Sequence, residues 1–510
     1  MSATNSNSKY GGTQLQAILV PWLVVVAVLI GLVTTFFLHK SFQTNSSAGL
    51  PDFWRGRRAK YTYNIGAIDA VGATQRGYQK FKLSLFQITG STSILSLLNT
   101  FTAPKSITID PQFIDELKAL PDDVLGFTQA VEETYLHMYL QQVSSMALTS
   151  WHPSDRLNPV IAGEVIESMH LELPQSSEWT EVNITSKLLR VITKASGRVF
   201  VGPELCRDES YINAAINYTI DLMIAVHTLT LLPSWLRAFM SPWLPSVRKL
   251  QRRIYEADAF LRPIVTARKQ AAADSNYQSP DDLLQWLIDG QNKYGVKDDE
   301  KLAQYQLSIS FTAIQTTTSA TVNVQVPSTQ LIPTLREDVR QALEDSGGKF
   351  TTIAMQSMRK LDSFLMETMR HYPLLTVAFR RKVLKPFTLS SGQRIPSGVI
   401  IELPVLLLYR NEELFPNAQR FDPLRFYKIC ESREKDAPNG KATEIVTRSH
   451  FASVGKTNFT FGQGRHACPG RAFAVNEMKM IIGTMLMNYD IKMVDGAVKR
   501  YTNLKFGVQV

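Results

Sequence analysis

Fourteen residues near the end of the chain carry its strongest chemical signal, and residues 461–474 read FGQGRHACPGRAFA. The run places Cys468 in a glycine-rich loop before a segment whose apolar spacing predicts a helix. Gly464 and Gly470 can supply a positive φ or a close backbone approach, and Pro469 suits the first position of a helix. The start of such a helix favours a thiolate, so the loop is suited to present sulfur to a metal. A lone cysteine is also commonly a buried structural residue, and this alternative stays open.

A second pattern is an acid and a base three positions apart, Glu367 and Arg370, in the segment LDSFLMETMR at residues 361–370. This spacing places both side chains on one helix face. On a protein surface such a pair stabilises by only about 0.3 to 0.5 kcal/mol. Apolar residues surround this pair, however, and a buried pair needs further hydrogen-bonding partners to offset its desolvation.

A third segment, LSISFTAIQTTTSATVNVQV at residues 307–326, is an apolar helix interrupted by threonines. Threonine is a poor helix former, and a buried threonine hydroxyl commonly bonds the carbonyl one turn back. Taken alone, these threonines are most simply explained as hydrogen-bonded core residues.

In this order along the chain, the three patterns resemble those of the cytochrome P450 family. The family's haem-binding loop has Phe, Gly, Arg, Cys and Gly at fixed spacing, and this chain has Phe461, Gly464, His466, Cys468 and Gly470 there. The family's Arg contacts a haem propionate, and a His can donate a hydrogen bond to the same anion. The resemblance implies haem b, iron protoporphyrin IX, as the cofactor, with the Cys468 thiolate as the axial ligand of the iron.

The same resemblance implies a structural role for the acid and base pair. Residues 421–426 read FDPLRF and look like the family segment that donates an Arg to the Glu and Arg of a core helix. Glu367, Arg370 and Arg425 would then form a charged lock that holds the core together.

The threonine-rich segment is similar to the family's oxygen-binding helix, whose pattern is Ala, Gly, any residue, an acid and Thr. Ala313 takes the first position, Ile314 replaces the Gly and Thr316 replaces the acid, so that Thr317 supplies the hydroxyl on the oxygen side. The resemblance implies that Thr317 is catalytic. Because neither Thr nor Gln titrates near neutral pH, protons must arrive through Thr317, Gln315 or ordered water.

Two further sets of residues are expected around the cofactor. Arg380 or its neighbour Arg381 should contact a haem propionate, and we select Arg380, although a solvated basic pair is also consistent with the sequence. The substrate pocket should be apolar. Its candidate residues, each of which could instead be ordinary core, are Phe311, Ala313, Ile314, Val377 and Ala378.

An uncharged segment at residues 17–38 is long enough to cross a membrane. A helix of this length spans about 33 Å, against a hydrocarbon core of about 30 Å. Positive residues follow it and almost none precede it, which predicts a retained single-pass anchor rather than a cleaved signal peptide. We expect a lumenal tail at 1–16, a transmembrane anchor at 17–38, a linker at 39–60 and a cytosolic haem-thiolate monooxygenase domain at 61–510, on the endoplasmic reticulum membrane.

The composition, with 44% hydrophobic and 20% charged residues among 510, is that of a globular protein. Three cysteines give no disulfide framework and fit a reducing compartment. The family resemblance implies a mainly α-helical fold with small β-sheets, of the α+β class. A net charge of +10 suits anionic membrane lipid or an acidic protein partner. Neither zinc-finger spacing nor a phosphate loop is present to support nucleic acid binding.

The resemblance implies a haem-thiolate monooxygenase that inserts one oxygen atom from O2 into a lipophilic small molecule. The residues around Ala313 and Cys468 resemble fungal enzymes of terpenoid and related secondary metabolism, including the ent-kaurene oxidase-like branch. Electrons would come from NADPH through a separate cytochrome P450 reductase, with cytochrome b5 as a second candidate donor, because the chain has no dinucleotide fingerprint. Two other classes stay open, namely an isomerase or dehydratase that works without a reductase and a non-catalytic haem-binding sensor.

Overall fold

The structure is a computed structural model, and the residues that it describes all lie in the second of two compact units, 1–61 and 62–510. The described residues are 63–65, 88–90, 106–135, 156–230, 232, 234–294, 302–324, 331–375, 377–436, 446, 449–455 and 458–492. The predicted tail, anchor and linker lie outside them. Within these ranges no helix combines the length and the apolar character needed to cross a bilayer.

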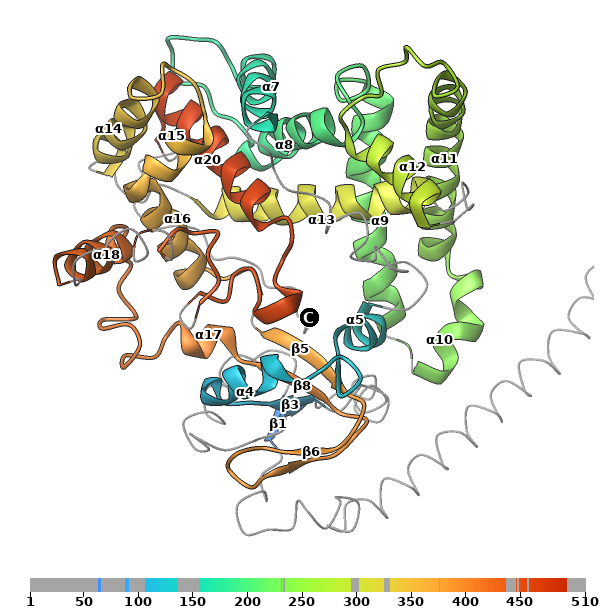
Figure 1. Ribbon diagram of the computed structural model, residues 1–510, viewed down its shortest axis with the longest axis vertical. Helices are drawn as coiled ribbons and strands as arrows, with labels where there is room; N and C mark the ends of the chain where they lie inside the picture. The colour runs from blue at the N-terminus through green and yellow to red at the C-terminus, as the bar shows by residue number, and fades with distance from the viewer. Residues whose placement is uncertain are drawn as a thin grey trace, which may run out of the picture. The chain divides into compact units, whose positions relative to one another are not determined.

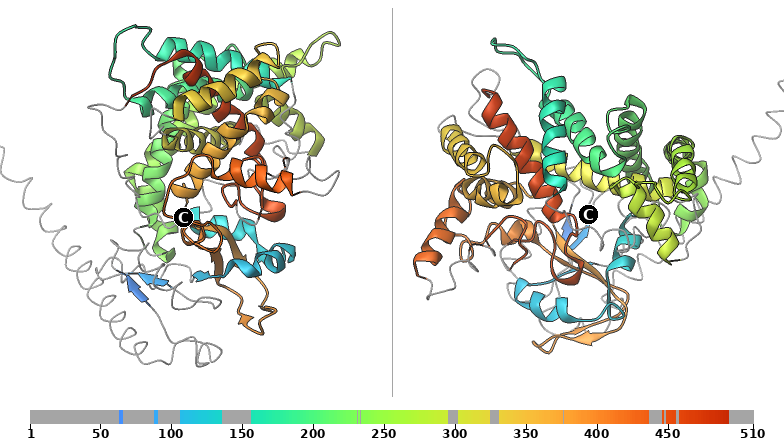
Figure 2. Two further views of the ribbon diagram at one scale, coloured as in Figure 1. Left: turned by 90° about the vertical axis from the view of Figure 1, so that its left-hand side faces the viewer. Right: turned by 45° about the horizontal axis from the view of Figure 1, so that its top comes forward.

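Helices make up most of the described chain and gather on one side of it, with the small sheets on the other (Figures 1 and 2). The larger helices are α7 (Leu157–Glu172), α8 (Ile184–Phe200), α9 (Glu209–Thr230), α11 (Pro245–Ala271), α12 (Leu283–Tyr294), α13 (Leu302–Asn323), α14 (Leu331–Glu344), α16 (Arg359–His371), α18 (Arg425–Lys435) and α20 (Arg471–Asn488). The shorter helices are α4 (Ile114–Ala119), α5 (Phe127–Tyr135), α10 (Ser234–Met240), α15 (Thr352–Ser357) and α17 (Val405–Leu408), with 3-10 turns η2 (Pro111–Phe113), η3 (Ser241–Trp243) and η5 (Gly464–His466).

Three small sheets accompany the helices. The largest has the strand order β3-β8-β5-β4, where β3 (Ser106–Thr108) is parallel to β8 (Ile400–Leu403), and β5 (Ala378–Val383) is antiparallel to both β8 and β4 (Leu125–Gly126). The other two are the parallel pair β1 (Tyr63–Ile65) with β2 (Ile88–Gly90) and the antiparallel pair β6 (Phe387–Thr388) with β7 (Arg394–Ile395). The prediction of a mainly helical fold with small sheets is thus confirmed.

Helix α13 crosses the middle of the helical part and contacts α8, α9, α11 and α20 (Figure 1). No glycine or proline interrupts it. Three of its threonine hydroxyls donate to carbonyls one turn back, Thr312 to Ser308, Thr316 to Thr312 and Thr321 to Thr317, at 2.6 to 2.9 Å. These bonds satisfy the hydroxyls locally, so an apolar core can accommodate a helix rich in threonine.

One buried carboxylate, that of Glu367 on α16, joins α16 to α18. Its side chain is fully enclosed and accepts hydrogen bonds from Nε and Nη2 of Arg370, both at 2.8 Å, and from Nε of Arg425 at 3.1 and 3.2 Å. The backbone amide of Asp422 adds a further bond at 2.9 Å. The three residues for which the sequence suggests a lock are therefore in direct contact.

Both lock arginines use their remaining N–H groups on backbone carbonyls between α17 and α18. Arg370 donates to Tyr409 and Ala418, and Arg425 donates to Pro416, Asn417 and Arg420. One carboxylate does not neutralise two guanidinium groups, so these carbonyls supply the rest of the compensation that buried charge requires. The lock therefore orders an irregular segment as well as two helices.

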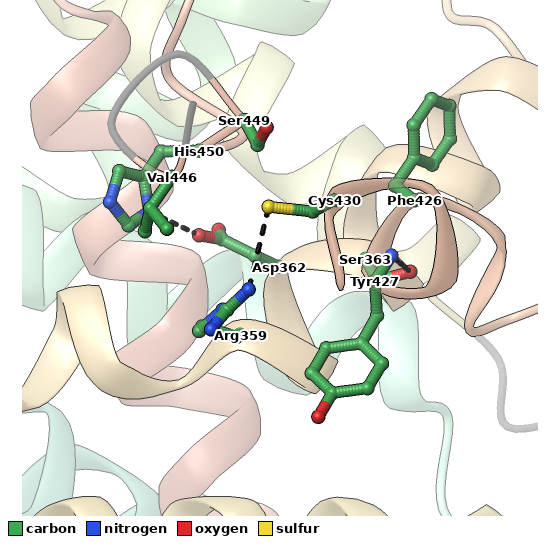
Figure 3. A pocket seen from close by; sticks show the side chains of 9 residues that line it. All are labelled: Arg359, Asp362, Ser363, Phe426, Tyr427, Cys430, Val446, Ser449 and His450. Atoms are coloured by element: carbon green, nitrogen blue, oxygen red, sulfur yellow. Dashed lines mark hydrogen bonds and ion pairs between the residues drawn. The ribbon is translucent and has the colours of Figure 1, made fainter. Parts of the chain in front are cut away.

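A small cavity lies between α16, α18 and the residues Val446, Ser449 and His450, and Figure 3 shows the side chains that line it. Asp362 points toward His450, whose Nδ1 lies 3.0 Å from the carboxylate, and Arg359 points toward the Cys430 sulfur, 3.4 Å from its Nη2. Asp362 also binds Nζ of Lys479, on α20, at 2.8 Å. Helix α16 thus holds α20, the helix that follows the cysteine loop.

The lock is expected to contribute much more to stability than a surface ion pair. Arg425→Ala should lower the free energy of unfolding by about 3 to 5 kcal/mol, because it breaks a buried charge network. Lys428→Ala is the matched control, since Lys428 lies on the same helix and pairs with Asp422 at the surface; its loss should be below about 1 kcal/mol. Urea denaturation measures both values, and similar losses for the two variants would contradict the role given to Arg425.

Candidate functional site

The loop before α20 is a tight turn built on two glycines with positive φ, Gly462 at 73° and Gly464 at 68°. The amide of Cys468 donates to the carbonyl of Phe461 at 2.7 Å, which closes the loop. Gly470 has a φ of −81° and caps α20. Gly462, rather than Gly470, is therefore the second residue that needs the conformational freedom of glycine.

The Cys468 thiol is partly buried. Helix α20 begins at Arg471 and not at Pro469 as predicted, so Cys468 lies three residues before the helix. Burial raises the pKa of the Cys468 thiol, and the Gly470 amide and the Arg471 charge offset only part of this effect. The expected preference for the thiolate is thus not met by the polypeptide alone. A coordinated metal would deprotonate the sulfur.

His466, expected near a haem propionate, is held by the segment between α4 and β4. Its Nε2 lies 2.8 Å from Oδ1 of Asp122, and its ring stacks on Phe127 with centroids 4.9 Å apart. The neighbouring Arg465 donates to the carbonyl of Leu120 at 3.2 Å. The cysteine loop is therefore fixed to the sheet side of the molecule as well as to α20.

The two candidate arginines on β5 point to different places. Arg380 faces the buried Glu402, with 3.5 Å between Nε and Oε2. Arg381 is 5% exposed and lies between the rings of Phe127 and Phe379, and it lines a cavity together with residues of the cysteine loop. The guanidinium of Arg381 therefore lies beside the cysteine loop, and that of Arg380 lies beside Glu402.

A bulge in β5 produces this arrangement. The register shifts between Ala378 and Arg381, and Phe379 has a φ of 50°, a conformation that residues other than glycine rarely adopt. The extra residue interrupts the regular pairing with β8 just before Arg381. Backbone strain of this kind persists only where the surrounding structure enforces it.

Arg381 is unusual because a buried guanidinium normally has an anionic partner. Burial lowers its pKa to about 10, and within the described part of the chain no carboxylate lies at ion-pair distance from it. Its cavity is also lined by Gln463, Arg465 and His466. Asp122 lines the same cavity and pairs with Arg465 and His466, whereas Arg381 remains available to an incoming anion.

The oxygen-side candidate Thr317 lies on α13 and is 2% exposed. Its Oγ1 has no hydrogen-bond partner among the described atoms, unlike Thr316, which is exposed and bonds its own helix at 2.6 Å. A buried hydroxyl without a partner costs free energy and indicates a missing neighbour such as water or a ligand.

The five residues predicted for the substrate pocket divide between two elements. Phe311, Ala313 and Ile314 lie on α13, whereas Ala378 begins β5 and Val377 immediately precedes it. Ile314 is fully enclosed in the main hydrophobic core, whereas the other four are partly buried. Neither of the two cavities already described is lined by any of the five.

Two residues near the site were not predicted from the sequence. Asp122 gave no signal, because it lies 344 positions from the His466 that it binds. Glu477 follows Cys468 on α20 and looks like an ordinary surface position of a helix, yet it is fully buried near Thr317. The mostly apolar residues that follow Glu477 on this helix were the available signal of burial.

Comparisons with known proteins agree with this geometry. The family model for Cytochrome P450 matches residues 137–509. The Cytochrome P450 monooxygenase ATR3 of Stachybotrys chlorohalonatus is 39% identical over 352 residues, 68% of this chain and 73% of that protein. The Cytochrome P450 monooxygenase AN1598 of Emericella nidulans is 31% identical over 446 residues, 84% of this chain and 79% of that protein.

Among solved structures, a retinoic acid-bound cyanobacterial CYP120A1 matches with a TM-score of 0.57 at 19% identity. The match covers 82% of this chain and 87% of that one, and it shows a shared fold. Membership of the family implies a haem with a cysteine thiolate ligand, a redox partner and a small-molecule substrate. The chain belongs to the cytochrome P450 family and is a cytochrome P450 monooxygenase.

Proposed function

We propose that Cys468 is the axial thiolate ligand of haem b, and that the enzyme inserts one oxygen atom from O2 into a lipophilic small molecule. The observation that carries this proposal is the loop geometry, which presents one sulfur just before α20 on a loop that shares a cavity with the buried Arg381. The family membership indicates a haem-dependent oxidation, and Cys468 marks where the haem iron would be bound.

The residues present fit such a cofactor. A soft sulfur donor suits iron, and the loop backbone closes around it. Arg381 and His466 would meet the propionates, whose carboxylates match the fork of a guanidinium.

When bound, the haem supplies oxygen activation, and the thiolate contributes electron density that favours cleavage of the oxygen bond. The chain supplies the rest. Cys468 holds the iron, Thr317 presents a hydroxyl from α13, and the lock on Glu367 keeps the loop and helices in place. Position 316 has no acid, so the chain needs another group to hold the proton.

For the substrate, we propose a terpenoid or related secondary metabolite of a fungus. The apolar side chains of Phe311, Ala313, Val377 and Ala378 favour a lipophilic molecule. The relatives reported above are P450 monooxygenases of fungi, which supports a fungal metabolite as the substrate. The ent-kaurene oxidase-like branch is the working comparison for a first substrate panel.

For its location, we propose that residues 17–38 anchor the enzyme in the endoplasmic reticulum membrane with the catalytic body in the cytosol. Electrons would then come from NADPH through a membrane-bound cytochrome P450 reductase, with cytochrome b5 as an additional donor. The net charge of +10 is suited to an acidic redox partner.

Replacing the proposed iron ligand should abolish the thiolate signature. Cys468→Ala should lose the reduced, carbon monoxide-bound absorption band that is characteristic of thiolate-ligated haem, together with NADPH-dependent oxidation in microsomes. Cys430→Ala, which removes the cysteine beside Arg359, is the control and should keep both. An unchanged band in Cys468→Ala would refute the assignment of the ligand.

Arg381 should retain the cofactor through a charge-assisted hydrogen bond. Arg381→Gln should weaken the free energy of haem binding by about 1.5 to 3 kcal/mol. Haem transfer to apomyoglobin should then be roughly tenfold to hundredfold faster than in the wild type. Lys385→Gln, just beyond the end of β5, removes an exposed charge paired with Asp123 and should leave the release rate unchanged. Equal rates in all three proteins would rule out a propionate contact for Arg381.

A further inference from the structure

One aromatic side chain, that of Phe127 at the start of α5, contacts two of the residues that line the cavity beside the cysteine loop. The ring of His466 stacks on it, with the centroids 4.9 Å apart and an angle of 19° between the ring planes. The guanidinium carbon of Arg381 lies over the same ring, 4.9 Å from its centroid. Arg381 belongs to the sheet and His466 to the loop, so one ring joins the two parts of the cavity wall.

The pairing of β4 with β5 explains why Phe127 lies beside Arg381. The two strands are antiparallel, and Gly126, the last residue of β4, is opposite Lys382. Continued by one residue, this register sets Phe127 opposite Arg381, at the point where β4 ends and α5 begins. Side chains of opposed residues in an antiparallel pair lie on the same face of the sheet and contact each other. Helix α5 then runs against β5, which keeps the ring in place (Figure 1).

Stacking between rings suits a guanidinium whose N–H groups are needed elsewhere. Arg381 is 5% exposed and also lies over the ring of Phe379, 4.5 Å from its centroid. A planar guanidinium can stack through its faces while its N–H groups point outward along its edges. One of these groups, on Nη1, donates to the carbonyl of Arg380 at 2.8 Å. The contacts with the two rings therefore offset part of the cost of burying the charge and leave N–H donors for an anion.

Phe127 itself is poorly placed to serve the hydrophobic core. It is 37% exposed, whereas the core residue Phe364 is fully enclosed. A partly exposed ring removes less apolar surface from water and stabilises the fold less. His466, which stacks on the ring, is held in turn by Asp122, with 2.8 Å between Nε2 and Oδ1. The contacts of Phe127 with the polar cavity wall therefore indicate a role other than core packing.

We propose that Phe127 is a positioning residue for the cofactor, whose ring holds the Arg381 guanidinium ready for a haem carboxylate. The inference rests on the proposed function, in which haem binds at Cys468. A long arginine side chain loses conformational freedom when it binds an anion. Because the ring already restricts that side chain, less of this entropy is lost when the carboxylate binds. Through its stacking with His466, the ring also keeps Arg381 in a fixed position relative to the cysteine loop.

The rate at which haem leaves the purified full-length protein for apomyoglobin tests this role. Phe127→Leu should release haem roughly threefold to thirtyfold faster than the wild type, since leucine keeps much of the apolar bulk but offers no π face to the cation. Phe127→Tyr keeps the ring and should stay within about twofold of the wild-type rate. Phe239→Leu, which changes an exposed phenylalanine of α10, is the matched control and should leave the rate unchanged. An unchanged rate in Phe127→Leu, or an equal acceleration in Phe127→Tyr, would overturn the proposal.

Positioning and simple packing differ in how the effect depends on Arg381. A positioning ring acts through the guanidinium, so in the Arg381→Gln background Phe127→Leu should change the release rate by less than about twofold. A ring that only packs α5 on β5 would speed release by the same factor whether Arg381 is present or not. Equal factors in the two backgrounds would therefore rule out the positioning role.

The haem spectrum separates this inference from the proposed function. Phe127→Leu should fold, because the ring is partly exposed, and it should keep the reduced, carbon monoxide-bound band of thiolate-ligated haem. If it does not fold, Phe127→Met, which also lacks a π face, takes its place in both comparisons. Haem-bound wild-type and variant proteins that release haem at the same rate would overturn only the role of Phe127. A wild-type protein without the thiolate band would instead overturn the proposed function.

Discussion

The rest of the structure depends on the burial of one negative charge, the carboxylate of Glu367. Alone in a protein core, such a charge would be strongly unfavourable, so it requires ion pairs with Arg370 and Arg425. The two arginines in turn require hydrogen bonds to backbone carbonyls. This requirement fixes α16 against α18 and orders the chain that joins α17 to α18. Because Asp362 on α16 also binds Lys479 on α20, the constraint extends to the helix that begins beside Cys468.

The proposed site draws on three parts of the molecule. The cysteine loop brings the sulfur, the sheet brings a buried arginine through a strained bulge, and α13 brings a hydroxyl that has no partner among the described residues. Each of these features is unfavourable in isolation. Strain, unpaired buried charge and unsatisfied hydroxyls are common at functional sites, where a ligand or a reaction compensates for them.

The sequence predicted those parts of the site that depend on local spacing. Glu367 and Arg370 are three positions apart in apolar surroundings, so both their helix and their burial could be foreseen. The positions of the Arg380 and Arg381 guanidinium groups could not be foreseen from the sequence, because the bulge at Phe379 decides which of them lies beside the loop. Asp122 and Glu477 were missed for a similar reason, since their roles arise from tertiary contacts between distant segments, and an acid on a helix is usually solvated. Positive φ at Gly462 rather than Gly470 also depends on how the loop closes.

The central claim is that Cys468 and the iron of a haem are directly bonded. X-ray absorption at the iron edge of the purified ferric protein measures this bond. The account predicts one sulfur neighbour in the first shell together with the nitrogen atoms of the macrocycle, and no sulfur neighbour in Cys468→Ser. A first shell of nitrogen and oxygen atoms alone in the wild-type protein, or a sulfur neighbour that persists in Cys468→Ser, would contradict it.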